Sequence, residues 1–176
     1  WSMYGVGPAA GAMLADLGAE VIKIEEPIRG DGLRGFETSA GGIPVHLPNG
    51  CNVLFEEHNR NKKSLAVDLK TPSGLEIMYG LVARADVFLT NFRPKVVQGL
   101  GLGYEQLKSH NPKLVYASSA GFGHKGPDAE LGTIDYVAQA RSGVMISDDR
   151  GVTWTKTTIE RGGGGTLRVR SIASSS

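Results

Sequence analysis

The chain has 176 residues, of which 40% are hydrophobic and 21% are charged, a composition typical of one globular domain with a modest core. Its 19 basic and 18 acidic residues nearly cancel. This balance argues against nucleic acid as a partner, because proteins that follow phosphate backbones carry a net basic face. No apolar run reaches the roughly 18 residues of a membrane helix, so no membrane partner is expected. A single cysteine, Cys51, and the lack of a visible signal peptide lead us to expect a cytoplasmic protein.

The hydrophobic pattern alternates between helical and strand periodicity. Pro8 favours the first turn of the first helix, and Gly18 is suited to end it. In chain order the pattern predicts a helix at 8–17, a strand at 19–24, an irregular excursion at 27–50, a strand at 64–68, a helix at 72–84, a strand at 86–90, helices at 94–100 and 104–109, a strand at 113–118 and a helix at 133–145. Strands separated by helices form a parallel sheet with helices on its faces, so the predicted fold class is α/β. Ligands of such sheets bind beyond the carboxyl ends of the strands, which here means the loops near Glu25, Asn91 and Gly121.

The last part of the chain differs in composition. Four consecutive glycines, residues 162–165, and a terminal run of serines carry no amphipathic pattern. We therefore interpret residues 1–147 as one partial domain and residues 148–176 as a divergent, poorly ordered tail.

Residues 5–10, with the sequence GVGPAA, match the glycine pattern of dinucleotide-binding folds. The next predicted strand ends at Glu25 and Glu26, where an acid would hold the ribose hydroxyls. The strand that should precede the motif is absent, with four residues before Gly5, and such glycines also serve close helix packing. An NAD-dependent oxidoreductase remains an alternative function.

Short segments of a second, more specific pattern follow one another in order over most of the chain. They are Gly7–Gly11, Leu14–Glu25, Gly30–Asp31, Asn59–Ser64, Val67–Lys70, Ala85–Val87, Asn91–Pro94, Gly101–Tyr104, Asn111–Tyr116, Gly121–Gly123, Gly126–Pro127, Gln139–Ala140 and Ser142–Gly143. Together they resemble the family III CoA-transferases, the CaiB/BaiF family that includes formyl-CoA transferase. The superfamily also contains alpha-methylacyl-CoA racemase.

The resemblance implies a Rossmann-like parallel sheet with helices on both faces, a second, smaller domain and a homodimer of two interlocked subunits. Family members transfer coenzyme A between an acyl-CoA and a carboxylic acid. The implied partners are therefore these two substrates, with CoA thioester as substrate and no tightly bound cofactor. Against the family pattern the chain is interpreted as an N-terminal fragment without the first strand and the small C-terminal domain, and we expect the fragment alone to be inactive. An acyl-CoA racemase is a further alternative.

The resemblance also implies CoA binding by seven residues. They are Tyr4, Gly5, Val6, Lys70, Asn91, Phe92 and Arg93. Phe92 is suited to stack on adenine and Arg93 to pair with a phosphate. Four further cations are candidate phosphate neighbours: Arg34, Arg60, Lys62 and Lys63. Glu26 departs from the family pattern, because some relatives carry a CoA-binding arginine there.

The catalytic residue is not found. The family nucleophile is an aspartate in a Gly-Asp pair, no such pair follows Met145, and Glu160 is a weak substitute near the expected place. Asp135 matches an acidic position beside the active site, and Ile134 stands where a racemase has its proton-moving histidine. An isoleucine carries no proton, which disfavours a racemase. The histidines lack metal-ligand spacing, so no metal is expected.

Overall fold

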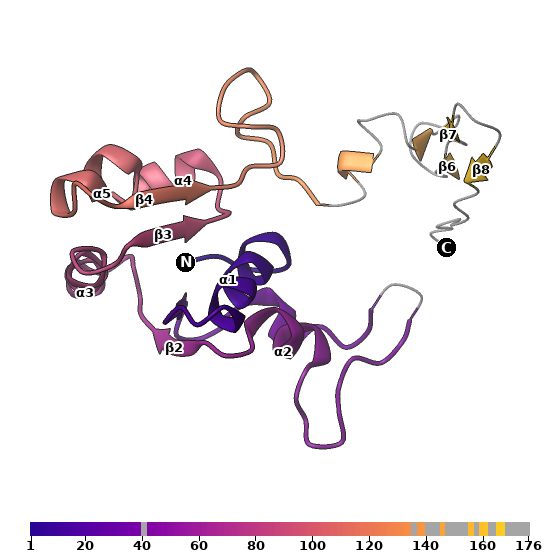
Figure 1. Ribbon diagram of the computed structural model, residues 1–176, viewed down its shortest axis with the longest axis horizontal. Helices are drawn as coiled ribbons and strands as arrows, with labels where there is room; N and C mark the ends of the chain where they lie inside the picture. Colours follow the sequence, from indigo (N-terminus) through magenta and orange to yellow (C-terminus); the bar gives the residue numbers. More distant parts are fainter. Residues whose placement is uncertain are drawn as a thin grey trace. The chain divides into compact units, whose positions relative to one another are not determined.

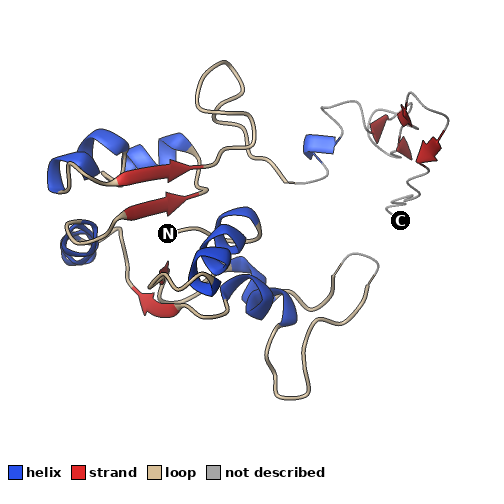
Figure 2. Ribbon diagram, in the orientation of Figure 1, coloured by secondary structure: helices blue, strands red, loops and turns tan. Residues whose placement is uncertain are grey.

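The computed structural model describes residues 1–39, 42–134, 137–139, 145–146, 155–156, 159–161 and 165–167. They fall into two compact units, Trp1–Glu130 and Leu131–Ser176. In the first unit helices and strands alternate along the chain (Figures 1 and 2). Its elements are α1 (Val6–Asp16), β1 (Ile22–Glu25), the 3-10 helix η1 (Gly32–Gly35), α2 (Val53–Asn59), β2 (Lys63–Ala66), α3 (Pro72–Val82), β3 (Val87–Thr90), α4 (Pro94–Gly99), α5 (Tyr104–His110) and β4 (Val115–Ser118). Every helix and strand predicted within this unit is present, which confirms the α/β class.

The strands of the first unit form two parallel ladders. β1 pairs with β2 and β3 pairs with β4, each over four residues. The sequence predicted one sheet, whereas in the described part of the chain β1 and β3 are not paired with each other. The segment before α1 contacts both ladders instead. Lys23 of β1 donates to the carbonyl oxygen of Ser2 at 3.0 Å, and Asn91, directly after β3, bonds the main chain of Met3.

Two short helices were missed by sequence reasoning, and both depend on side-chain caps. The Asn52 side chain accepts from the main-chain N–H groups of Leu54 and Phe55 and so begins α2. The Asp31 side chain accepts from Leu33 N and begins η1. Both lie within or just after the excursion at 27–50, where a single polar cap was not recognised as the start of a helix.

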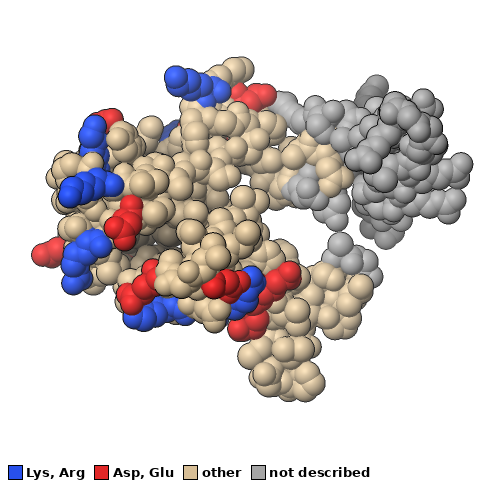
Figure 3. Space-filling model, viewed as in Figure 1, with Lys and Arg blue, Asp and Glu red and all other residues tan. Residues whose placement is uncertain are grey.

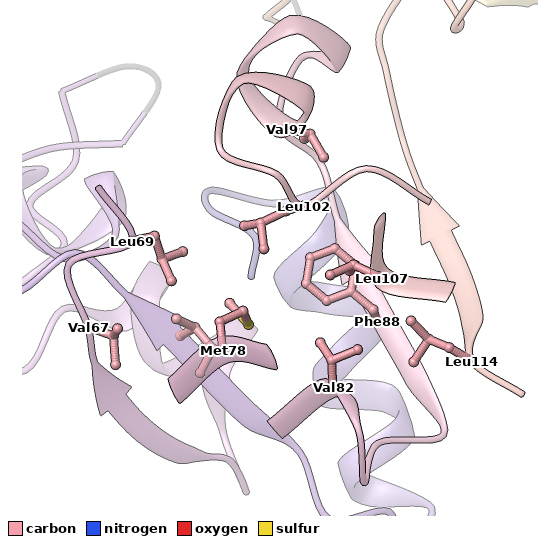
Figure 4. Packing of buried hydrophobic residues seen from close by; sticks show 10 residues of the cluster. Val67, Leu69, Met78, Val82, Phe88, Val97, Leu102, Leu107 and Leu114 are labelled. Carbon is pink, nitrogen blue, oxygen red and sulfur yellow. The ribbon is translucent and has the colours of Figure 1, made fainter. Parts of the chain in front are cut away.

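The core of the first unit forms where α3, α4 and α5 meet the strands and their following loops (Figure 4). Leu102 and Leu107 are completely buried, and Met78 is 3% exposed. The cluster consists of Ile24, Val67, Leu69, Met78, Val82, Phe88, Val97, Leu102, Leu107 and Leu114. Burial of each large apolar side chain stabilises the fold by about 1.5–3 kcal/mol, so this cluster fixes the strand ends and the loops that follow them.

The described residues of the second unit include a helical segment at 137–139 and four short strands. The strands form two antiparallel pairs: β5 (Met145–Ile146) with β6 (Thr155–Lys156), and β7 (Ile159–Arg161) with β8 (Gly165–Leu167). The predicted helix at 133–145 is wrong at both ends, because residues 133–134 are not helical and Met145 pairs with Lys156. This strand pairing depends on a segment 11 residues away, so it cannot be predicted from the hydrophobic pattern of residues 133–145 alone. The interpretation of residues 148–176 as a poorly ordered tail stays a prediction, since most of them lie outside the described residues.

Among the described residues, no helix is both long enough and apolar enough to cross a membrane.

Candidate functional site

A pocket of about 210 Å³ opens beyond the carboxyl ends of β1 and β2, the edge of the ladders at which the sequence predicted ligand binding. Its walls are mainly apolar and come from β1, from α4, from the segment before α1 and from the loops that follow β1, β2 and β3. They include Ile24, Val67, Leu69, Phe92, Val96 and Leu100. The polar residues that line the pocket are Ser2, Glu25, Glu26, Asp31, Asp68 and Lys70. An apolar pocket with a few polar groups suits a planar, largely uncharged ring with charged substituents outside it.

One wall of the pocket is aromatic. The rings of Trp1 and Phe92 stack at 4.0 Å between centroids and 14° between planes. Phe92 is fixed at the end of β3, where its main-chain N–H donates to Oγ1 of the buried Thr90. A flat, rigid wall of this kind favours stacking of a planar ligand, although one face of Phe92 is already covered by Trp1.

The predicted CoA-binding residues that follow the strands have different surroundings. Lys70 lines the pocket with its side chain exposed, and its main-chain N–H donates to Asp68 at 3.0 Å. Arg93 is exposed at the start of α4 and is not among the pocket's lining residues. Asn91 binds the main chain of Met3 with both ends of its amide, at 3.0 Å and 2.7 Å. The structure therefore brings Lys70 and Phe92 together at the pocket and gives Asn91 a contact with the segment before α1.

The turn into α1 contains the other three predicted residues, at positions 4–6. Tyr4 has a φ of 62°, a left-handed conformation that L residues with side chains rarely adopt. Its main-chain N–H donates to Oδ1 of Asp31 at 3.0 Å. Three residues after Tyr4, a Cβ at Gly7 would lie 2.6 Å from the Cβ of Ser2. Glycine is therefore required there, because the chain before α1 folds back against the helix.

Two ion pairs anchor the loop between β1 and η1. Lys23 and Asp31 lie 2.6 Å apart, with their side chains 5% and 0% exposed. Arg34 binds both carboxylate oxygens of Glu25 at 2.9 Å and lies over the ring of Phe55 at 3.7 Å. Burial by itself raises the pKa of Glu25, but the hydrogen bonds from Arg34 and from the Asp31 main chain outweigh it and hold the pKa below its usual value. Glu25 in turn raises the pKa of Arg34.

Sequence reasoning gave no role to Lys23 or Asp31. A signal existed, because Lys23 sits between two apolar residues of a strand and a lysine buried there must be paired. Its partner is eight residues away, in the excursion for which the sequence predicted no regular structure.

The other cations considered as phosphate neighbours have protein partners. Arg60 binds Asp16, with Nη2 2.5 Å from a carboxylate oxygen, and Lys63 binds Glu20 at 2.6 Å. On the face seen in Figure 3, blue and red side chains are interspersed rather than gathered into one basic patch. In this structure these cations serve ion pairs, so the interpretation that they neighbour phosphate gains no support.

Lys62 is half-buried beneath α1. Its amine donates to the carbonyl oxygens of Pro8 and His58, both at 2.7 Å, and to Asn59 Oδ1 at 3.0 Å. Burial, with repulsion from Lys23, lowers the pKa of Lys62 to about 8. Lys62 thus joins α1 to α2 rather than facing the pocket.

No catalytic acid can be assigned among the described residues. Ile134 is 66% exposed, Asp135 lies outside the described residues, and of Glu160 only the main chain is described. The two acids that would hold the ribose hydroxyls in a dinucleotide-binding protein already have protein partners. Glu25 binds Arg34, and Glu26 accepts from main-chain N–H groups of the following turn. In the described part of the chain, no three His, Cys, Asp or Glu side chains gather as metal ligands would.

Residues 1–162 match CoA-transferase family III. The chain therefore belongs to this family, whose α/β fold and parallel strands it shares. It is 45% identical over 143 residues to the succinate–glutarate CoA-transferase of Agrobacterium fabrum, covering 79% of this chain and 34% of that protein. It is 46% identical over 138 residues to the cinnamoyl-CoA:phenyllactate CoA-transferase of Clostridium sporogenes, covering 78% of this chain and 32% of that protein.

A solved structure of a CAIB/BAIF family protein from Brucella suis superposes with a TM-score of 0.69 at 39% identity, covering 82% of this chain and 38% of that one. The chain thus spans about a third of the length of the curated relatives that it matches.

Proposed function

We propose that the protein transfers coenzyme A between an acyl-CoA and a carboxylic acid, and that this chain forms the part that holds CoA. The observation that carries the proposal is the apolar pocket beyond β1 and β2, with Lys70 beside it and the Trp1–Phe92 stack as one wall. CoA combines a planar adenine with a ribose phosphate and a pyrophosphate, which matches an apolar pocket with a lysine at its border.

In this proposal adenine enters the pocket and packs against the aromatic wall. Lys70 and the exposed Arg93 meet phosphate oxygens, since a guanidinium binds phosphate with two parallel hydrogen bonds. The main chain of residues 4–6 borders the pantetheine arm. CoA is therefore a substrate here, and the acid acceptor and the nucleophilic carboxylate remain to be assigned. We further propose a homodimer, as the family resemblance implies, that acts in the cytoplasm, as the single cysteine indicates.

Calorimetric titration of the purified protein with CoA and with NADH tests the proposal. CoA should bind and NADH should not. Lys70→Ala and Arg93→Ala should each weaken CoA binding about tenfold or more, because a hydrogen bond to a charged group contributes about 1.5–3 kcal/mol. The matched control is Lys113→Ala, which removes an exposed lysine just before the amino end of β4. Preference for NADH, or equal CoA affinity in all three variants, would overturn the proposal.

The chemical half of the proposal has its own measurement. The assay uses the whole transferase, because we expect this chain alone to be inactive. The enzyme is mixed with an acyl-CoA and an isotopically labelled carboxylic acid, and the CoA esters are separated and their masses measured by mass spectrometry. Label should enter the CoA ester in proportion to protein concentration. Free CoA accumulating without labelled ester would indicate hydrolysis instead of transfer.

A further inference from the structure

We propose that the buried Lys23–Asp31 pair is a positioning pair, which holds the main chain of Tyr4 in its left-handed conformation. It thereby positions residues 4–6, which the proposed function assigns to CoA binding and which directly follow the pocket-lining residues Ser2 and Met3. This inference rests on the proposed function, because it assigns a task to two side chains that do not themselves meet the ligand.

The carboxylate of Asp31 accepts three hydrogen bonds. Oδ1 accepts from the main-chain N–H groups of Tyr4 and Leu33, each at 3.0 Å, and Oδ2 accepts from Lys23 at 2.6 Å. Lys23 also donates to the carbonyl oxygen of Ser2 at 3.0 Å. The pair therefore binds the chain on both sides of Met3, and it ties that chain to β1 and to η1.

The conformation that these bonds hold is a strained one. Apart from glycines, only Tyr4 and Asn61 have positive φ among the described residues. A residue with a side chain persists in such a conformation when its surroundings over-determine it, and such residues gather at binding sites and catalytic sites. The Tyr4 ring is held as well, since a Cβ at Gly32 would lie 2.5 Å from three of its atoms. Both the main chain and the ring of Tyr4 thus depend on residues 31–32.

The pair acts through Tyr4 and not by contact with the ligand. Asp31 is among the residues that line the pocket, but its side chain is 0% exposed and that of Lys23 is 5% exposed, so neither side chain offers a surface to CoA. A second clamp is Asn91, whose side-chain amide binds the main chain of Met3. Between the two clamps the chain has little freedom, and the turn into α1 is presented in one geometry.

The charge of the pair matters as well as its shape. A carboxylate accepts from all three donors at once, whereas an asparagine at position 31 has one oxygen and an NH2 group. That NH2 group would face either Lys23 or the N–H of Tyr4, placing donor against donor. The Asp31→Asn variant keeps the volume of the side chain but cannot accept all three hydrogen bonds, so it tests the charge of the pair separately from its shape.

The experiment compares four forms of the protein: wild type, Asp31→Asn, Asp31→Asn with Tyr4→Gly, and Asp16→Asn. The last is the control, because it removes the carboxylate of an exposed ion pair with Arg60 at the other end of α1. Two quantities are measured on each folded form. One is the hydrogen-exchange rate of the residue 4 amide without ligand, by NMR, and the other is the affinity for CoA.

We expect Asp31→Asn to speed exchange of the Tyr4 amide at least tenfold and to weaken CoA binding about tenfold. Glycine at position 4 adopts the left-handed conformation without strain, so adding Tyr4→Gly should recover most of the CoA affinity. A general loss of stability would not be rescued in this way. The control should match the wild type in both measurements.

The outcomes are distinguishable. Unchanged exchange at the Tyr4 amide in Asp31→Asn overturns the positioning role. Faster exchange with unchanged CoA affinity overturns its connection to the ligand. If the wild type binds no CoA, the proposed function has failed, and the role in CoA binding fails with it, whatever the exchange rates are.

Discussion

Replacing Gly74 with alanine should destabilise the first unit and disturb the loop that carries Lys70. A Cβ at Gly74 would lie 2.7 Å from the carbonyl carbon of Asp68 and closer still to its oxygen, where ordinary contact begins at 3.4 Å. Overpacking against main chain costs up to about 3 kcal/mol, and alanine returns up to about 1 kcal/mol of helix propensity. We therefore expect a net loss of about 2 kcal/mol in the free energy of unfolding, measured by urea denaturation with circular dichroism, and weaker CoA binding.

Gly80→Ala is the matched control, because it makes the same substitution in the same helix. A Cβ at Gly80 would have no neighbour within 4 Å, so this variant should gain about 0.5–1 kcal/mol from propensity alone. The two alanine variants should therefore differ by about 3 kcal/mol. A Gly74→Ala protein as stable as the wild type would refute the reasoning from close approach.

Three further predictions concern burial and charge. Leu102→Ala should lower the free energy of unfolding by about 2–5 kcal/mol, because Leu102 is completely buried. The control Leu17→Ala, at a side chain that is 85% exposed, should change it by less than about 0.5 kcal/mol. Equal effects of the two variants in urea denaturation would contradict the assignment of Leu102 to the core. The pKa of Lys62 is about 8 in the native state and near 10.5 when unfolded, so its contribution to the free energy of unfolding should rise with pH between these values. NMR should show one lysine amine that titrates near pH 8 and is lost in Lys62→Met. Titration of every lysine near pH 10.5 would contradict this prediction. Glu25 has a lowered pKa, so it contributes stability that is lost as pH falls through that pKa. Arg34→Met removes the partner that lowers this pKa, so acid denaturation of the variant should begin at a higher pH than in the wild type. Coincident denaturation curves would contradict the stabilising ion pair.

The order of elements could be predicted from the sequence because it is encoded locally. Apolar residues at helical spacing in α3, with Pro72 in its first turn, and β-branched runs such as β1 mark their own structure. The elements that were missed or misplaced depend on something else. α2 and η1 need the caps of Asn52 and Asp31, and β5 needs its partner strand.

The candidate site divides in the same way. Position after a strand was enough to predict that Phe92 and Lys70 lie close together, and both line the pocket, since parallel strands bring their carboxyl ends to the same edge. It was not enough to predict that Asn91 binds the main chain of Met3, 88 residues away, rather than pointing to the pocket.

By itself, the sequence determined the α/β class, the order of the elements and the family, because periodicity and short motifs lie within single segments. Only the tertiary structure decided which charges are free to meet a ligand. Arg34 and Lys23 are committed to Glu25 and Asp31, while Lys70 stays exposed at the pocket. The reason is physical: whether a charge is paired depends on the carboxylate that folding places beside it, and burial makes that pairing obligatory.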